Sequence, residues 1–191
     1  MAIVTGLALA IIIVIVVIII IVIAFIVMYN GLVKLRNTVE EAFSTMDVYM
    51  KKRFDLIPNL VETVKGYAAH EKETLEKVIQ ARNFAQSAGN PEDMIHGDEM
   101  LTGALKSLFA IAENYPQLRA NESFMNLQHQ LQNAEEDIAN SRKYYNGTVR
   151  MYNTKTEVFP SSLIASMFHF VRKPLYELAD VAERENIKVQ F

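Results

Sequence analysis

Apolar and polar residues are distributed in two distinct ways along this chain. Residues 7–28 form an uninterrupted apolar run, and no charged residue or histidine occurs before Lys34. A hydrocarbon core about 30 Å thick needs roughly 20 helical residues to cross it. The run therefore predicts one transmembrane helix. Four residues mark successive depths along it: Leu7, Ile15, Ile20 and Met28.

Beyond this run, apolar residues recur at steps of three and four, which is the spacing of one face of a helix. The first such series begins at Leu32 and continues to about Ser87, where Gly89 and Pro91 are typical of a helix end. The spacing runs through residues 29–34 without a break. We therefore expect the transmembrane helix to continue directly into this helix.

Pro58 lies inside this first predicted helix. Proline lacks a backbone donor and crowds the carbonyl four residues earlier, which here belongs to Phe54. We therefore expect a kink at residues 54–58. Asn59 follows at once, and its amide could donate a hydrogen bond to the freed carbonyl.

Shorter series of the same kind predict further helices. Pro91 starts a short helical turn that Gly97 is expected to end. The helices that follow are predicted at 98–114, 121–159 and 161–167, with another from about residue 174, and only 187–191 alternate as a strand would. The predicted fold is all-α. An N-terminal transmembrane anchor (residues 1–29) continues into an elongated antiparallel helical bundle of three to four main helices (residues 30–191).

Composition and charge exclude several classes of protein. The net charge is −3, which leaves no basic excess to attract nucleic acid. The chain has no cysteine, which excludes disulfides, thiolate metal ligands and a lipid anchor on cysteine. We interpret the basic cluster Lys51–Arg53 as a solvated helix face or an interface rather than a nucleic-acid patch.

The sequence contains no recognisable catalytic pattern. Its four histidines include no pair three or four residues apart, and His70-Glu71 lacks the second histidine of a zinc-binding helix. His96–Glu99 could at most hold a metal loosely in a loop. The glycine motifs of nucleotide sites and the serine motif of hydrolases are absent from the sequence. We therefore predict no enzymatic activity, no cofactor, no metal and no catalytic residue.

The dipeptide Tyr-Asn occurs three times, at Tyr29-Asn30, Tyr145-Asn146 and Tyr152-Asn153. The last two are seven residues apart, so each tyrosine and each asparagine recurs on one helix face. Such residues can form a hydrogen-bonded core that fixes the register of the helices. The alternative is a polar groove that binds a peptide or a small ligand.

The ends of the apolar run bear on cleavage, orientation and association. The run has no basic residue before it and is longer than the 7–15 apolar residues of a signal peptide, so we predict an uncleaved anchor. Lys34 and Arg36 follow it, which favours a cytoplasmic domain with the N-terminus outside.

Three small residues near the start of the run, Ala2, Gly6 and Ala10, stand four apart, a spacing that lets a second helix approach closely.

Several segments of the chain resemble the LemA family in their order and spacing. They are Tyr29–Asn37, Asp55–Val61, Thr63–Glu71, Tyr115–Asn121, Phe124–Gln128, Tyr145-Asn146, Tyr152-Asn153 and Phe159-Pro160. Phe43, where tryptophan is expected, and the loop 87–100 depart from the resemblance. The resemblance implies a bacterial single-span membrane protein with a helical-bundle domain and without a defined catalytic residue.

The matched polar positions are candidates for structural or interface roles. They are Asp55, Asn59, Asn121, Gln128, Asn146 and Asn153, to which the patterns above add Pro58, Tyr145 and Tyr152.

The predicted function is that of a membrane-anchored scaffold or adaptor in the inner or plasma membrane of a bacterial cell. Its expected partners are the lipid bilayer, further copies of the same chain and an unidentified protein, but not nucleic acid. The alternative is a membrane-linked sensor that binds a small ligand or peptide in the Tyr/Asn-lined groove. The sequence identifies neither the partner nor the process.

Overall fold

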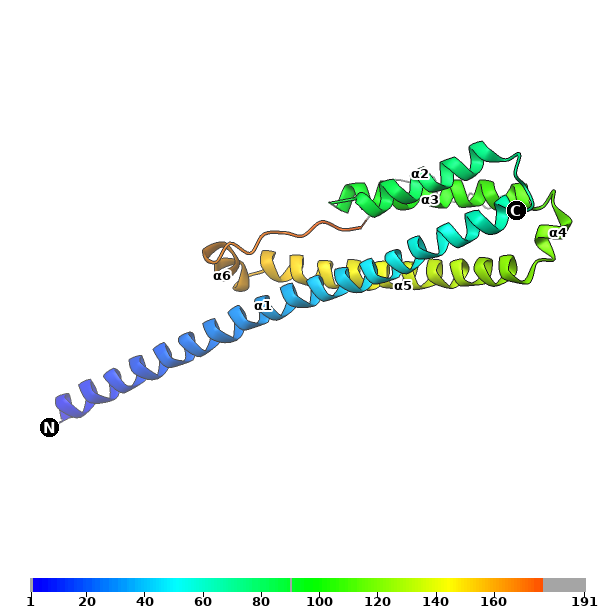
Figure 1. The fold of residues 1–191 in the computed structure, drawn as a ribbon. Helices are drawn as coiled ribbons and strands as arrows, with labels where there is room; N and C mark the ends of the chain where they lie inside the picture. Colours follow the sequence, from blue (N-terminus) through cyan, green and yellow to red (C-terminus); the bar gives the residue numbers. More distant parts are fainter. Residues whose placement is uncertain (1, 90, 177–191) are drawn as a thin grey trace, which may run out of the picture. The chain divides into compact units, whose positions relative to one another are not determined.

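The computed structural model describes residues 2–89 and 91–176. Within these ranges the chain forms six helices and no strand, which confirms the predicted all-α fold (Figure 1). The helices are α1 (Ala2–Lys65), α2 (Lys72–Ser87), α3 (Pro91–Ala112), α4 (Pro116–Arg119), α5 (Glu122–Glu157) and α6 (Ser161–Met167).

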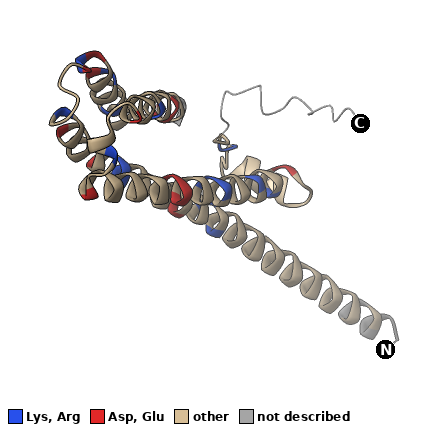
Figure 2. Cartoon of the chain, turned by 90° about the vertical axis from the view of Figure 1, so that its right-hand side faces the viewer, with Lys and Arg blue, Asp and Glu red and all other residues tan. Residues whose placement is uncertain are grey.

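Helix α1 runs through residues 29–34 without a break, as the continuous spacing predicted. By length and composition, it is the one helix in the described part of the chain that could cross a membrane. Its N-terminal part carries no charge (Figure 2). The large apolar side chains from Leu9 to Ile23, Ile15 and Ile20 among them, are 48–62% exposed. The side chain of Leu7 lies outside the described part.

The first helix of the domain ends earlier than predicted. It stops at Lys65 rather than near Ser87, and a turn at residues 66–71 separates it from α2. The amide of Ala68 donates to the carbonyl of Val64 at 2.8 Å, which closes the last turn of α1. Ala68 is buried like the helix residues on either side of the turn. The apolar spacing therefore continues across a real break.

Gly97 does not end a helix as predicted, because α3 runs through it from Pro91 to Ala112. A Cβ atom placed on Gly97 would lie 2.6 Å from the Cα of Ala85 in α2. Glycine at this position therefore permits a close approach of α2 and α3 rather than a turn. The predicted N-cap, Asn90, lies outside the described residues.

The helix also continues through Pro58. The carbonyl of Phe54, which Pro58 deprives of its normal partner, accepts a hydrogen bond from the Nε of Arg82 at 3.4 Å. The prediction that Asn59 donates to this carbonyl is wrong. The side chain of Asn59 is exposed, and Arg82 of α2 donates the hydrogen bond instead. The kink itself stays a prediction.

The remaining predicted helices agree with the structure or fall outside it. The long helix predicted at 121–159 is α5, preceded by the short α4, and the helix predicted at 161–167 is α6. Residues 170–176 are not helical. The rest of the helix predicted from residue 174, and the strand-like residues 187–191, lie outside the described residues.

Two compact units make up the chain. The anchor unit comprises residues 1–42 and 146–173, and the bundle unit comprises residues 43–145 and 174–191. In the anchor unit, Leu32 of α1 packs against α6. This core consists of Leu32, Ile164 and Ala165, with Phe25, Met28, Tyr29 and Phe170 packed around it.

In the bundle unit, the segments of α1 and α5 are antiparallel. The rings of Phe43 and Tyr145 lie 5.8 Å apart, and further along α1 Arg53 contacts Glu135, so numbers rise on one helix as they fall on the other. Helices α2 and α3 pack against each other in the same unit (Figure 1).

Candidate functional site

Four of the predicted polar candidates lie on exposed helix surface. They are Asp55, Pro58 and Asn59 on α1 and Gln128 on α5. The backbone carbonyl of Asn59 accepts a hydrogen bond from the hydroxyl of Thr63 at 2.7 Å, while its side chain points away from the core. The structure does not gather these four side chains with the tyrosines and asparagines.

Asn121 has a defined structural position at the start of α5. Its Oδ1 accepts a hydrogen bond from the amide of Phe124 at 2.9 Å, which is the geometry of a helix N-cap. Its Nδ2 donates to the hydroxyl of Tyr67 at 3.0 Å, just beyond the end of α1. One side chain thus starts α5 and joins it to the turn after α1.

In the anchor unit, Asn153 binds the backbone of Lys173 in both directions. Its Nδ2 donates to the carbonyl of Lys173, and its Oδ1 accepts from the amide of the same residue, each at 2.9 Å. Asn153 is buried, as is the neighbouring Tyr152, and burial raises the pKa of Tyr152 above its usual value. Asn146 is half-buried.

In the bundle unit, Tyr145 makes a related contact. Its hydroxyl donates to the carbonyl of Pro174 at 2.9 Å, and burial raises its pKa. Tyr145 and Asn153 thus each bind backbone of the chain itself. Two surface hollows in the bundle unit have other linings, one around Val61, Leu75 and Ile79 and one around Ala81, Met100 and Ala104.

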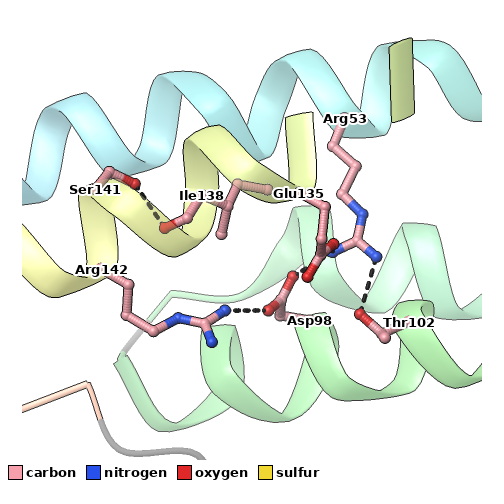
Figure 3. Close-up of polar contacts among 7 residues, drawn as sticks. All are labelled: Arg53, Asp98, Thr102, Glu135, Ile138, Ser141 and Arg142. Carbon is pink, nitrogen blue, oxygen red and sulfur yellow. Dashed lines mark hydrogen bonds and ion pairs between the residues drawn. The ribbon is translucent and has the colours of Figure 1, made fainter. Parts of the chain in front are cut away.

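The most concentrated polar chemistry is a buried ion network in the bundle unit, formed by Arg53, Asp98, Thr102, Glu135 and Arg142 (Figure 3). Arg53 Nη1 lies 2.7 Å from Asp98 Oδ1 and 3.0 Å from Glu135 Oε2, and its Nη2 donates to Thr102 at 2.9 Å. Arg142 Nη2 lies 2.9 Å from Asp98 Oδ2. Asp98 on α3 therefore joins α1 to α5.

Burial dominates the electrostatics of this network. Asp98 is 3% exposed and Arg53 is 2% exposed. Burial raises the pKa of Asp98, and the two guanidinium groups oppose that effect. Arg142 also lies over the ring of Tyr176, with its Cζ atom 4.7 Å from the ring centroid, and burial raises the pKa of Tyr176. Removing one member of such a network leaves a buried charge unpaired, which costs about 3–5 kcal/mol.

Comparison with known proteins identifies the family to which this chain belongs. A family model described as the LemA family matches residues 42–191, which include the whole buried ion network. The chain belongs to the LemA family. The resemblance stated from its motifs is confirmed.

Individual relatives of this LemA-family chain are distant in sequence. It is 22% identical to a protein named Protein LemA from Metamycoplasma hominis over 156 residues, covering 80% of this chain and 70% of that protein. It is 23% identical over 178 residues to Magnetosome protein MamQ 1 from Paramagnetospirillum magneticum, covering 80% of this chain. For Magnetosome protein MamQ from Magnetospirillum gryphiswaldense the identity is 21%, covering 77% of this chain.

The chain spans 65% and 64% of the lengths of these two MamQ proteins. Family membership together with the apolar α1 describes a membrane-associated helical protein with bacterial relatives.

Sequence interpretation misplaced the members of the ion network. The cluster Lys51–Arg53 was expected to be a solvated helix face or an interface. Lys51 and Lys52 are exposed, but Arg53 is buried among the chain's own helices. Arg53 falls on the buried seam, three residues after Met50 and four before Ile57, and this spacing is the signal that could have revealed it. A charge on an apolar face needs a buried partner.

Asp98 was predicted to begin the helix at 98–114 and to belong to a segment, 96–99, that could at most hold a metal loosely in a loop. In the structure this segment is helical, and both oxygens of Asp98 contact arginine. No group of three or more His, Cys, Asp or Glu residues in the described part of the chain could hold a metal ion. The arrangement stabilises charge and holds three helices together, and it leaves neither oxygen of Asp98 free of a guanidinium.

Proposed function

We propose that this LemA-family chain is a membrane-anchored scaffold that acts through protein contacts and assembles with copies of itself. The observation that carries the proposal is the continuity of α1. One helix contains the apolar run and also contributes Leu32 to the core of the anchor unit and Arg53 to the ion network of the bundle unit. An anchor built into a folded core is suited to holding partners at a membrane.

The surface of the apolar helix supports self-association. Residues 9–24 of the apolar segment are exposed on this chain, so lipid or another helix can cover every face of this part of α1. A Cβ atom on Gly6 would meet nothing within 4 Å. Small residues at such positions let two transmembrane helices approach closely and gain van der Waals contact. A second copy is therefore the partner we propose for the face that carries Gly6 and Ala10.

The test is the copy number of the full chain in lipid nanodiscs, measured by mass photometry over a range of protein-to-lipid ratios. We expect particles with more than one copy, and fewer of them for the double variant Gly6→Ile, Ala10→Ile. Val16→Ile, on the same exposed helix, serves as the matched control. A single copy per disc at every ratio would contradict self-assembly.

For the orientation, we propose that the bundle unit lies in the cytoplasm, because Lys34 and Arg36 follow the apolar run. The chain has no cysteine, so one introduced thiol reports on sidedness without interference. Ser107→Cys places it at an exposed position on α3. An impermeant maleimide should label this thiol only after the cells are opened, and labelling of intact cells would reverse the assignment.

A second candidate function is a sensor that recognises a peptide. The contact of Asn153 with the Lys173 backbone favours it, because the same two hydrogen bonds could hold a competing strand of another protein. A synthetic peptide matching residues 168–176 should then bind the full chain saturably, and Asn153→Ala should weaken that binding. Absence of binding would leave Asn153 with a structural role alone.

A further inference from the structure

Large apolar side chains crowd the exposed surface of α6 and its flanks in the anchor unit. We call this set the α6 patch; it consists of Phe159, Leu163, Met167, Phe168 and Val171, which are 80%, 62%, 64%, 44% and 68% exposed. Single exposed apolar residues are common, but Leu163 and Met167 are four residues apart on one face of α6, and a concentration of such residues marks a surface with a partner. The opposite side of α6, with Ile164 and Ala165, is buried against Leu32.

The α6 patch lies beside the last apolar turns of α1. The ring of Phe168 is 5.9 Å from that of Phe25 and 4.8 Å from that of Tyr29. The apolar run of α1 ends at Met28. Residues of α6 and its C-terminal flank are therefore level with side chains that belong to the transmembrane segment itself.

The depth follows from helix geometry. Phe25 precedes Met28 by three residues, which at 1.5 Å per residue places it about 4.5 Å inside the end of the run. Helices that lie in a membrane interface bury their apolar face roughly 5–10 Å into the boundary between headgroups and acyl chains. Phe168, the residue of the α6 patch that contacts Phe25, thus lies close to the shallow end of that depth range, while Ile164 and Ala165 on the buried side of α6 pack against Leu32 just beyond the run.

The surrounding chemistry suits the same boundary. Helix α6 carries no charged residue. Phe25, Tyr29 and Phe168 form an aromatic group, and Tyr29 in it follows the run at the level where membrane proteins concentrate tyrosine and tryptophan. On the domain side, Arg36 lies over the ring of Phe170, with its Cζ atom 5.5 Å from the centroid, so a cation follows the aromatic group in the direction of the headgroups.

We propose that the α6 patch is a second membrane-contacting element, which lies in the lipid interface around the end of α1. Its partner is the boundary of headgroups and acyl chains in the leaflet that α1 leaves at Met28. This inference rests on the anchoring of α1 that is part of the proposed function. The chain would therefore hold the membrane at two places in its sequence more than 130 residues apart, since Leu163 follows Met28 by 135 positions.

The test uses tryptophan as a depth probe, because the chain has none. Leu163→Trp reports on the α6 patch, and Val17→Trp reports on the middle of the apolar run. Met125→Trp, an exposed position on the α5 segment of the bundle unit, is the control. Each full-length variant is reconstituted in nanodiscs whose lipids carry bromine at a shallow or a deep acyl position.

We expect the Leu163→Trp fluorescence to fall at least twofold with shallow bromine and less with deep bromine. Val17→Trp should show the reverse order, and Met125→Trp should be unaffected by either. If Val17→Trp is quenched but Leu163→Trp is not, the α6 proposal is overturned while the anchoring stands. If Val17→Trp itself is not quenched, the anchoring fails and the α6 proposal falls with it.

A second copy of the chain is the competing occupant of the patch. In that case the emission of Leu163→Trp would be shifted to the blue, as in an apolar setting, yet lipid bromine would not quench it, and this result overturns lipid contact. A charge variant gives an independent check. Met167→Asp in the Leu163→Trp background should reduce the shallow quenching, whereas Ser166→Asp, also exposed on α6, should reduce it less.

Discussion

The two units of this LemA-family chain are stabilised by different kinds of contact. In the anchor unit, α1 and α6 meet through aromatic and aliphatic side chains around Leu32, which attract one another in many relative orientations. In the bundle unit, α1, α3 and α5 share a buried carboxylate and two guanidinium groups that fit in one geometry. We therefore expect apolar packing to stabilise the anchor unit and the ion network to fix how the helices of the bundle unit align. The contrast predicts different responses to substitution.

The largest effect is expected from Asp98→Ala in the bundle unit. This change leaves the guanidiniums of Arg53 and Arg142 buried without their shared carboxylate, and the free energy of unfolding should fall by about 3–5 kcal/mol. Guanidinium titration of the full chain in a mild detergent measures it. Glu136→Ala, at an exposed position on α5, is the control and should change stability by less than about 0.5 kcal/mol.

A triple variant sharpens the same point. Replacing the network with apolar side chains, as Arg53→Met, Asp98→Leu and Arg142→Met together, should restore most of the stability that Asp98→Ala loses. The helices should then lose their single packing arrangement rather than their stability. This loss would appear as broadened amide resonances for α3. If the triple variant is as unstable as Asp98→Ala, the network contributes net stability as well as register.

The next effect concerns the close approach of α2 and α3. Gly97→Ala places a Cβ atom 2.6 Å from the Cα of Ala85, so the helices must separate, at a cost of about 1–3 kcal/mol. Gly103→Ala on the same helix meets nothing within 4 Å, and it should raise stability by about 0.5–1 kcal/mol because alanine favours helix. Opposite signs in thermal unfolding would support this; equal destabilisation by both would contradict it.

In the anchor unit, Asn153→Ala removes two hydrogen bonds to the Lys173 backbone. It leaves the part-buried N–H and C=O of Lys173 without these partners, which should lower stability by about 1–3 kcal/mol. Asn140→Ala, an exposed site on the same helix, is the control. Hydrogen exchange at the Lys173 amide should rise in Asn153→Ala only. Unchanged protection there would show that other contacts hold this segment.

The smallest effect is a dependence on alkaline pH. Burial raises the pKa of Tyr145, Tyr152 and Tyr176 in the folded state, so above about pH 10 the unfolded chain releases protons that the folded chain keeps. Stability should be insensitive to these groups below about pH 9 and should decline above pH 10. Tyr176→Phe should flatten the decline, whereas Tyr144→Phe, an exposed position, should leave it unchanged.

Periodicity predicted the long elements of the fold well, because burial on one face of a helix is a strong constraint on sequence. It predicted the continuity of α1, the extent of α6 and nearly that of α5. It failed at residues 66–71, because Ala68 keeps the apolar spacing across the turn. It failed at Gly97 as well, since glycine serves both turns and close packing and the sequence does not distinguish them.

The polar interior was much harder to predict. A charged residue is assigned to the surface by default, because most charges are solvated. Arg53 and Asp98 are 45 positions apart, and their contact depends on how α1 and α3 pack. The Tyr/Asn pattern did indicate residues with structural contacts, but their partners proved to be backbone atoms at Lys173 and Pro174, which carry no side-chain signature. Local sequence patterns therefore predict the helices, whereas the partners of buried polar side chains depend on how those helices pack.

The contact of Leu32 with Ile164 and Ala165 has a consequence for how the protein is made. Synthesis proceeds from the N-terminus at roughly 5–20 residues per second, so the partners of Leu32 leave the ribosome on the order of ten seconds after it. The last residue of α1, Lys65, follows Leu32 by only 33 positions, so for most of that interval all of α1 has been made while α6 has not. The nascent chain therefore passes through a stage in which the face of α1 that carries Leu32 can contact only the membrane or the biosynthetic machinery.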